Sequence, residues 1–304
     1  MSGAGANASS EAVVEMAIGQ PAPRLRPLVE RYVGYRLEGF APGCHQGLPS
    51  RHVTLIVSLD RPVELAVMPD PRQSPGSFWT LVGGLHSAPA TIRHDGRQHG
   101  VHLELSPLGT RALLGLPAAE LASTVVHLRD LLGPRGEELP ERLAGLAGWP
   151  ARFAVLDHFL AGVAAERAGP PAPVAWAWRR LVATGGGVEV AALAREAGWS
   201  RRHLGEAFRT ELGISPKVAA RVLRFERSCR LLRRRQRPRL AEVALASGYY
   251  DQAHLNREWR ELAGRSPAAW LAEELPSAEE PPSPDESNDE LPSVQDAAAG
   301  AEAS

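Results

Sequence analysis

Cysteine, lysine and long apolar runs are scarce in this sequence, and each scarcity excludes a class of protein. Cys44 and Cys229 are the only cysteines among 304 residues, and they lie far apart, so we expect neither a disulfide framework nor a cysteine-ligated zinc site. No stretch approaches about eighteen consecutive apolar residues, which argues against a membrane span. No N-terminal run combines positive charge, a long apolar segment and a cleavage site. We therefore predict a cytoplasmic protein with no membrane partner.

Acidic and basic side chains nearly balance over the whole chain but not along it. The net charge is −1, and Lys217 is the only lysine, so arginine carries almost all of the positive charge. Residues 1–170 carry 15 basic and 16 acidic side chains, residues 171–270 carry 19 and 9, and residues 271–304 carry 0 and 10. The middle block is therefore at +10 and the last block at −10. This asymmetry favours a polyanion partner for the middle block; the alternative is a set of well-solvated, arginine-rich helices.

Hydrophobic periodicity divides the chain into segments. We expect residues 1–22, which are small and polar, to be disordered. Residues 23–168 begin with short strand-like stretches such as HVTLIVSL and VHLELS and continue with helical spacing, as in ARFAVLDHFLAGV. After the stiff break GPPAP, residues 174–272 have helical spacing throughout, and residues 273–304 form an acidic tail expected to be disordered. The predicted fold class is α+β: a mainly β domain, sandwich-like or barrel-like, with following helices, and then an all-α domain.

The all-α segment contains one pattern twice. In the first copy a short apolar helix ends at Gly198, which supplies a turn, and Ser200 is a natural N-cap for the next helix. Leu204, Phe208 and Leu212 recur every four residues and so face inward together. The residues left on the outer face are Arg201, Arg202, Gly205, Glu206 and Arg209. This order is typical of a helix-turn-helix unit, whose second helix enters a DNA major groove.

The second copy repeats the order with one residue inserted at the turn. Gly248 corresponds to Gly198, and Leu255 and Trp259 correspond to Leu204 and Phe208. The outer face of its second helix consists of Asp251 or Gln252, Ala253, Asn256, Arg257 and Arg260. Both copies end in Gly-x-Ser-Pro. A single match to this pattern is weak evidence, but two copies with matched endings indicate two helix-turn-helix units.

The linker between the copies has a length that suits duplex DNA. SPKVAARVLRFERSCRLLRRR supplies about twenty helical residues, which span about 30 Å. Successive major-groove faces of B-DNA lie about 34–36 Å apart. We therefore predict that the two second helices enter adjacent major-groove segments on one side of a duplex.

Residues 174–272 resemble the DNA-binding domain of the bacterial AraC/XylS-type transcriptional regulators. The segments LAREAGWSRRHLGEAF, GISP, GYYDQAHLNREW and GRSP carry the resemblance. It implies base contacts by Arg202, Gly205, Glu206, Gln252, Ala253, Asn256 and Arg257, and phosphate contacts by Ser200, Arg201, Arg209, Arg234 and Arg260. Arg202 can donate to guanine O6 and N7, and Glu206 can accept from cytosine N4. The alternative for Glu206 is a surface ion pair with Arg202 or Arg209.

The N-terminal segment resembles a poorly characterised domain found on a subset of these regulators. PSRHVTLIVSLD, GLHSAPATIRHDG and GVHLELSPLGTRALLGLPAAEL carry this resemblance, which implies sensing of a small molecule or dimer formation. Histidines are frequent here, at His45, His52, His86, His94, His99 and His102. They lack metal-site spacing, so ordinary surface or core histidines are favoured over a metal site. Tyr32, Tyr35 and Trp79 could line a pocket, but a place in the core is favoured.

Together these patterns predict a sequence-specific transcriptional regulator controlled by its N-terminal domain. Expected partners are double-stranded DNA, a small-molecule effector, RNA polymerase and a second copy of the chain. The alternative is a protein that binds DNA without sequence choice, or binds another partner, and senses no ligand. We expect no enzyme activity and no cofactor, because the DNA-repair methyltransferases that share this module need a cysteine cluster. The acidic tail either competes with DNA for the basic surface or only aids solubility.

Overall fold

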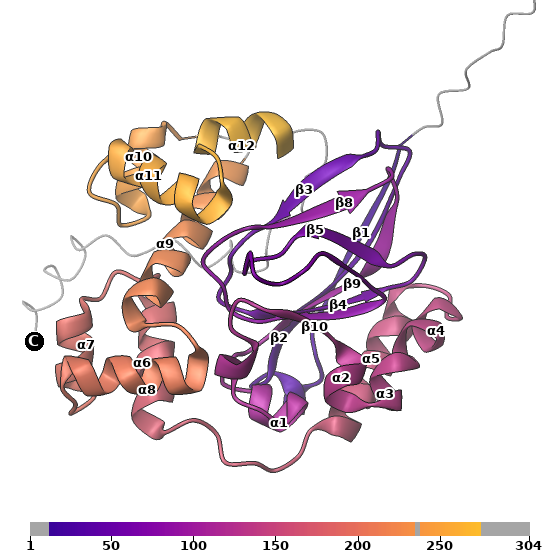
Figure 1. Ribbon diagram of the computed structural model, residues 1–304, viewed down its shortest axis with the longest axis horizontal. Helices are drawn as coiled ribbons and strands as arrows, with labels where there is room; N and C mark the ends of the chain where they lie inside the picture. Colours follow the sequence, from indigo (N-terminus) through magenta and orange to yellow (C-terminus); the bar gives the residue numbers. More distant parts are fainter. Residues whose placement is uncertain (1–11, 235–237, 275–304) are drawn as a thin grey trace, which may run out of the picture.

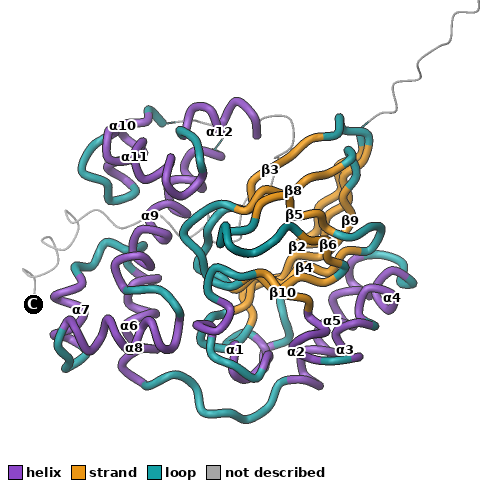
Figure 2. The backbone as a smooth tube through the Cα atoms, viewed as in Figure 1, coloured by secondary structure: helices purple, strands orange, loops and turns teal. Residues whose placement is uncertain are grey.

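The structure is a computed structural model that describes residues 12–234 and 238–274 (Figure 1). The N-terminal part contains the strands and a group of helices packed beside them, and the C-terminal part is helical (Figure 2). The acidic tail from residue 275 onward lies outside the described residues. No helix within the described ranges is long and apolar enough to cross a membrane.

Ten described strands form two antiparallel sheets. In order across the six-stranded sheet, the strands are β1 (Val13–Gly19), β2 (Val29–Glu38), β9 (Gln98–Leu105), β4 (Val53–Ser58), β7 (Thr80–Gly83) and β10 (Val125–His127). The four-stranded sheet has the order β3 (Gly43–Gly47), β8 (Ala90–His94), β5 (Val63–Val67) and β6 (Gly76–Phe78). Neither sheet closes into a barrel, so the sandwich-like form of the predicted fold class is confirmed.

Strand β1 contradicts part of the prediction that residues 1–22 are disordered, while residues 1–11 lie outside the described residues. Val13–Gly19 pairs with β2 along its whole length. The indole Nε1 of Trp149 donates to Glu15 Oε1 at 2.6 Å, and Gly19 lies so close to the ring of Phe153 that an added Cβ would overlap it. These partners are more than a hundred residues away in sequence, so a window of small and polar residues could not reveal them.

The helices follow the sheets in chain order. A one-turn 3-10 helix, η1 (Pro23–Leu25), precedes β2, and a second, η2 (Ala118–Leu121), follows β9. The helices of the N-terminal part are α1 (Thr110–Leu114), α2 (Leu128–Leu132), α3 (Pro134–Glu137), α4 (Leu139–Ala144) and α5 (Trp149–Val163). The C-terminal helices are α6 (Ala172–Ala183), α7 (Val190–Glu196), α8 (Arg201–Leu212), α9 (Pro216–Arg233), α10 (Leu240–Ala246), α11 (Gln252–Ala263) and α12 (Pro267–Glu274).

The hydrophobic core continues from the six-stranded sheet into the first helix-turn-helix unit. One cluster of buried side chains includes Leu103 on β9, Leu121 on η2, Leu181 on α6 and Phe208 on α8. The second unit has a separate cluster around Phe225, Trp259 and Trp270, and among the described hydrophobic residues of the N-terminal part only Leu48 packs against it. The two units therefore differ in how they are attached to the rest of the molecule.

Candidate nucleic-acid interface

The first unit has the local geometry that the sequence predicts. Gly198 adopts φ +73°, a value that glycine tolerates better than other residues, between α7 and α8. The Ser200 hydroxyl accepts a hydrogen bond from the backbone N–H of His203 at 3.1 Å and so caps α8. Leu204, Phe208 and Leu212 are fully buried. The opposite face of α8 is thus turned to solvent on a rigid, capped helix.

An ion pair occupies the outer face of α8. Arg202 Nε donates to Glu206 Oε1 at 2.8 Å, which confirms the surface pairing that we considered for Glu206. The two side chains are 89% and 56% exposed, so both remain accessible to a ligand. Gly205 is buried because Arg209 folds back over it, with Nη1 donating to the Gly205 carbonyl at 3.2 Å. The expectation that Gly205 lies open on this face is therefore wrong.

The second unit repeats the turn and the cap with different residues. Gly248 adopts φ +83°, and Asp251 Oδ1 accepts from the backbone N–H of His254 at 2.6 Å. Asp251 is therefore the N-cap of α11, and Gln252 is its first helical residue. The buried Trp259 side chain donates from Nε1 to Ser228 Oγ on α9 at 2.8 Å. This bond satisfies the indole N–H, which would otherwise be buried without a partner.

The outer face of α11 carries no acidic residue in contact with its arginines. Arg257 and Arg260 are exposed, and within the described ranges neither side chain has an ion-pair partner. Gln252 and Ala253 are exposed beside them, and Asn256 is half-buried. The two acidic residues of this helix both pair with Arg221 of α9: Glu258 points inward, with Arg221 Nε and Glu258 Oε1 2.9 Å apart, and the exposed Glu261 binds the same guanidinium group. The part of the exposed side around Arg257 and Arg260 is therefore positive and can meet an anion.

Helix α9 joins the units and contributes to both cores. Leu223 belongs to the first cluster, and Phe225 and Cys229 belong to the second. Cys229 is buried, which confirms the prediction that it is a core residue. Arg201 on α8 and Arg234 at the end of α9 are exposed. Both of these proposed phosphate-contact residues therefore face solvent.

The N-terminal part contacts α8, the glycine that ends it, and α9. Arg111 on α1 binds Glu211 on α8, with Nη2 and Oε2 2.9 Å apart. Gly213, which ends α8 with φ +77°, lies against Ala122, and an added Cβ would overlap that side chain. The backbone N–H of Arg51 donates to Glu226 Oε1 on α9 at 2.9 Å. Burial raises the pKa of Glu226, although the charge of Arg51 acts in the opposite direction.

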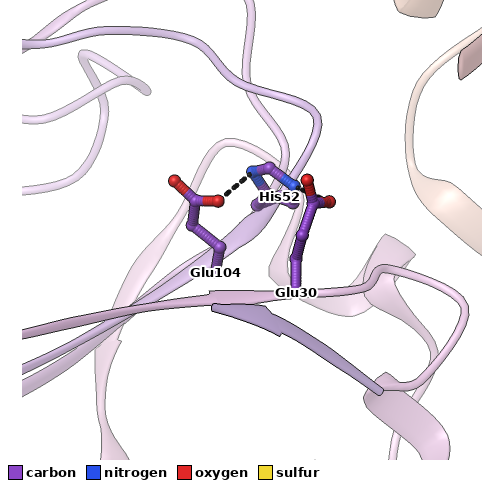
Figure 3. Close-up of side chains that lie close together, drawn as sticks. All are labelled: Glu30, His52 and Glu104. Carbon is purple, nitrogen blue, oxygen red and sulfur yellow. Dashed lines mark hydrogen bonds and ion pairs between the residues drawn. The ribbon is translucent and has the colours of Figure 1, made fainter. Parts of the chain in front are cut away.

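His52 lies between two carboxylates at this boundary (Figure 3). Its Nε2 is 2.7 Å from Glu30 Oε2, and its Nδ1 is 3.6 Å from Glu104 Oε2. One ligand atom from each residue lies within 4.8 Å of the others, so together they could contact a single cation. Arg31 already holds Glu104 through two hydrogen bonds, and Arg51 holds Glu30. A cation would have to compete with both guanidinium groups, so the cluster is better described as an ion network.

The ionisation of Glu30 reflects this network. Burial favours the neutral acid, but the hydrogen bond and charge of His52, together with Arg51, outweigh it and lower the pKa of Glu30 from 4.5 to about 2. The other histidines singled out in the sequence lie in different surroundings. His45 is exposed on β3, and its ring lies beside that of His94, with centroids 5.7 Å apart. His86 is half-buried, and its Nδ1 lies 2.6 Å from the carbonyl of Ala88.

A cavity of about 540 Å³ lies between the two parts of the molecule. Its apolar lining includes Leu28, Leu108, Trp178 and Val182, and its polar lining is Glu30, Arg51, His52, Ser106 and Arg179. None of the three aromatic residues singled out in the sequence lines this cavity. Tyr32 is fully buried in the core, and its hydroxyl donates to Asp157 Oδ1 at 2.8 Å. Trp79 is 49% exposed at the junction of β6 and β7, so the prediction of a core position is wrong for it.

Two families match the chain. Residues 193–273 match a helix-turn-helix domain, and residues 18–127 match a domain of unknown function, DUF6597. No curated protein matches it. Among solved structures, ToxT from Vibrio cholerae is 11% identical, with 79% of this chain and 97% of that chain covered and a TM-score of 0.49.

Two further solved structures are similar over smaller regions. The DNA-binding domain of the global transcriptional factor AdpA, solved with a target DNA, is 27% identical over 34% of this chain and 92% of that chain, with a TM-score of 0.31. The AraC-like transcriptional activator CuxR is 15% identical over 64% of this chain and 80% of that chain, with a TM-score of 0.27. These TM-scores are too low to transfer the neighbours' ligands or partners to this chain.

The helical units and the matched domain define a DNA-binding transcriptional regulator. More particularly, the chain carries an AraC-type helix-turn-helix domain on the C-terminal side of a DUF6597 domain.

Proposed function

We propose that this regulator is sequence-specific and that α8 and α11 read adjacent major-groove segments under the control of the N-terminal domain. The observation that carries the proposal is the pair of capped helices with solvent-facing polar surfaces, joined by one continuous helix. Helix α9 has 18 residues and is therefore about 27 Å long. With the flanking turns, this length is suited to two groove segments about one helical repeat apart.

The exposed residues divide into two proposed roles. Base contacts are assigned to side chains on the outer faces of the two reading helices, and phosphate contacts to arginines at their edges and to the cap of α8. The base contacts are Arg202, Glu206, Gln252, Ala253, Asn256 and Arg257; Gly205 is left out because Arg209 covers it. The phosphate contacts are Ser200, Arg201, Arg209, Arg234 and Arg260.

Control by the N-terminal domain is supported by its contacts with α8 and α9. Because Arg111 holds the end of α8 and Arg51 holds the middle of α9, a shift of the N-terminal domain changes how the two reading helices are presented. A small molecule in the cavity between the parts would touch Leu28 and Trp178 at once. We assign the effector site to this cavity, since ligand sites occur preferentially at domain interfaces.

The DNA-binding proposal is tested with the full chain on genomic fragments and on random duplexes of equal length. We expect tighter binding to some genomic fragments, a steep dependence on salt, and two protected segments about one helical turn apart. Equal affinity for all duplexes would favour DNA binding without sequence choice. A single protected segment would contradict the role given to one of the reading helices.

The control proposal is tested by loosening the interdomain contact. Arg111→Ala and Glu211→Gln should each change affinity for a genomic fragment by about fivefold or more, the lower end of typical coupling between sites. Arg72→Ala is a matched control, because it breaks an exposed Arg–Asp pair with Asp70 within the N-terminal domain. Control through this contact is contradicted if all three variants bind DNA as the wild type does.

A further inference from the structure

The residue inserted in the second helix-turn-helix unit is an exposed tyrosine. The first unit runs from Gly198 through Trp199 directly to the cap Ser200, whereas the second has Tyr249 and Tyr250 between its glycine and its cap. Tyr249 is buried at 3% exposure, and Trp199 likewise packs against its own core cluster. Tyr250 therefore has no counterpart in the first unit. At 86%, it is also the most exposed of the large hydrophobic side chains in the described residues.

The backbone at Tyr250 is held on both sides. Its N–H donates to His254 Nδ1 at 3.4 Å. The His254 ring stands edge-on to Tyr249, with centroids 5.3 Å apart, and its Nε2 lies 3.5 Å from Glu258 Oε1. The next residue, Asp251, is fixed as the cap of α11. A defined backbone thus presents a side chain that is almost fully exposed within the part of the chain that the structure describes.

This side chain projects at the end of α11 that enters the groove in a helix-turn-helix unit. Phosphate oxygens gather at helix N-termini because the free backbone N–H groups and the helix dipole attract them. A tyrosine hydroxyl can donate to such an oxygen while its ring packs against the neighbouring sugar. An exposed phenol contributes little to folding, so the free energy of burying it becomes available when DNA binds.

We propose that Tyr250 is a DNA-backbone contact unique to the second unit. Its hydroxyl donates to a phosphate that flanks the bases read by α11. The inference rests on the proposed function, because it requires α11 to enter the groove. The contact is neutral and independent of sequence, so it positions α11 and strengthens binding to any duplex.

The experiment compares Tyr250→Phe and Tyr250→Ala in the full chain with Leu245→Ala as the control. Leu245 is a 68% exposed apolar residue on α10 of the same unit. Each variant is titrated with a genomic fragment that the wild type binds and with a random duplex. Tyr250→Phe should lose about tenfold in affinity for both duplexes, as expected for one hydrogen bond to a charged acceptor. The slope of affinity against salt should stay unchanged, because no charge is removed.

A second measurement identifies the phosphate. Single methylphosphonate substitutions are scanned across the segment that α11 protects. One of them should weaken the wild type about tenfold and leave Tyr250→Phe unaffected. The inference is overturned if Tyr250→Ala binds both duplexes within twofold of the wild type, or if it loses affinity for the genomic fragment alone. A wild type that binds neither duplex would instead contradict the proposed function.

Discussion

The two helix-turn-helix units have nearly the same inward-facing residues and different outward-facing ones. Leu204 and Phe208 in α8 match Leu255 and Trp259 in α11, and all four are fully buried. The exposed pairs, first unit then second, are Arg202 and Ala253, and Glu206 and Arg257, and between them lie the buried Gly205 and the half-buried Asn256. One unit therefore presents an acid where the other presents a base. A duplicated fold can thus carry two different reading surfaces, because the outer face does not determine packing.

The two units also differ in how they are attached to the N-terminal part of the molecule. The first unit shares a continuous core with the β domain and is tied to it by Arg111 and Glu211. The second has its own core, and α9 carries most of its attachment. We infer that the first unit moves with the N-terminal domain and that α9 sets the position of the second.

The largest effect is expected from substitutions in the two hydrophobic cores, which test whether these cores are separate. Phe208→Ala and Trp259→Ala should each cost about 3–5 kcal/mol in free energy of unfolding, because both side chains are fully buried. Hydrogen exchange should show that Phe208→Ala also loosens η2 and the strands beneath it, whereas Trp259→Ala affects only the region from the middle of α9 to α12. The same exchange pattern in both variants would mean that the cores are not separate.

The outer faces of α8 and α11 are compared by measuring the DNA affinity of variants on each helix. Arg257→Ala should cost about 1–3 kcal/mol and relax the preference at one base pair. Arg202→Ala should cost less, because this guanidinium must give up part of its pair with Glu206 to meet a base. Arg234→Ala is the control and should weaken specific and random binding evenly. If Arg257→Ala also weakens both evenly, α11 does not read bases through this residue.

Two glycines of the first unit should respond in opposite directions. Gly205→Ala should raise the free energy of unfolding by about 0.5–1 kcal/mol, because a helical backbone favours alanine. The added Cβ meets only Arg209 Nη1, at 3.6 Å. Gly213→Ala should destabilise the protein, since its φ is +77° and the Cβ would overlap Ala122. Thermal unfolding measures both changes, and a destabilised Gly205→Ala would reveal a packing constraint at that position.

The smallest expected effect is the pH dependence of the stability that Glu30 contributes near the contact between the N-terminal domain and α9. The pKa of Glu30 is lowered to about 2 in the folded protein, so its stabilising contribution is present above pH 4.5 and is lost as the pH falls towards 2. Half of this side chain faces water, so we expect Glu30→Gln to lower the melting temperature by only about 1–2 °C at pH 6. The difference should vanish near pH 2. A difference that is constant across this range would contradict the assigned role.

Much of the DNA-binding part could be predicted from the sequence. The spacing of Leu204, Phe208, Leu255 and Trp259, the turn glycines and the cap Ser200 are local signals, and the structure has each of them in its predicted place. The exposed position of Tyr250 was not predicted, although the sequence contains a signal for it. The second unit has one more residue before its cap than the first, so only one of its two consecutive tyrosines can take the inward place of Trp199. The position of Trp79 was mispredicted, because its exposure depends on where two short strands end.

The sequence by itself determined the helices, the duplication and the class of partner, because periodicity, caps and charge act over a few residues. Only the tertiary structure decided that residues 13–19 form an edge strand, that the first unit shares its core with the β domain, and that His52 lies between Glu30 and Glu104. Each of these depends on side chains far apart in the chain, whose approach is set by packing of whole elements and leaves no local pattern.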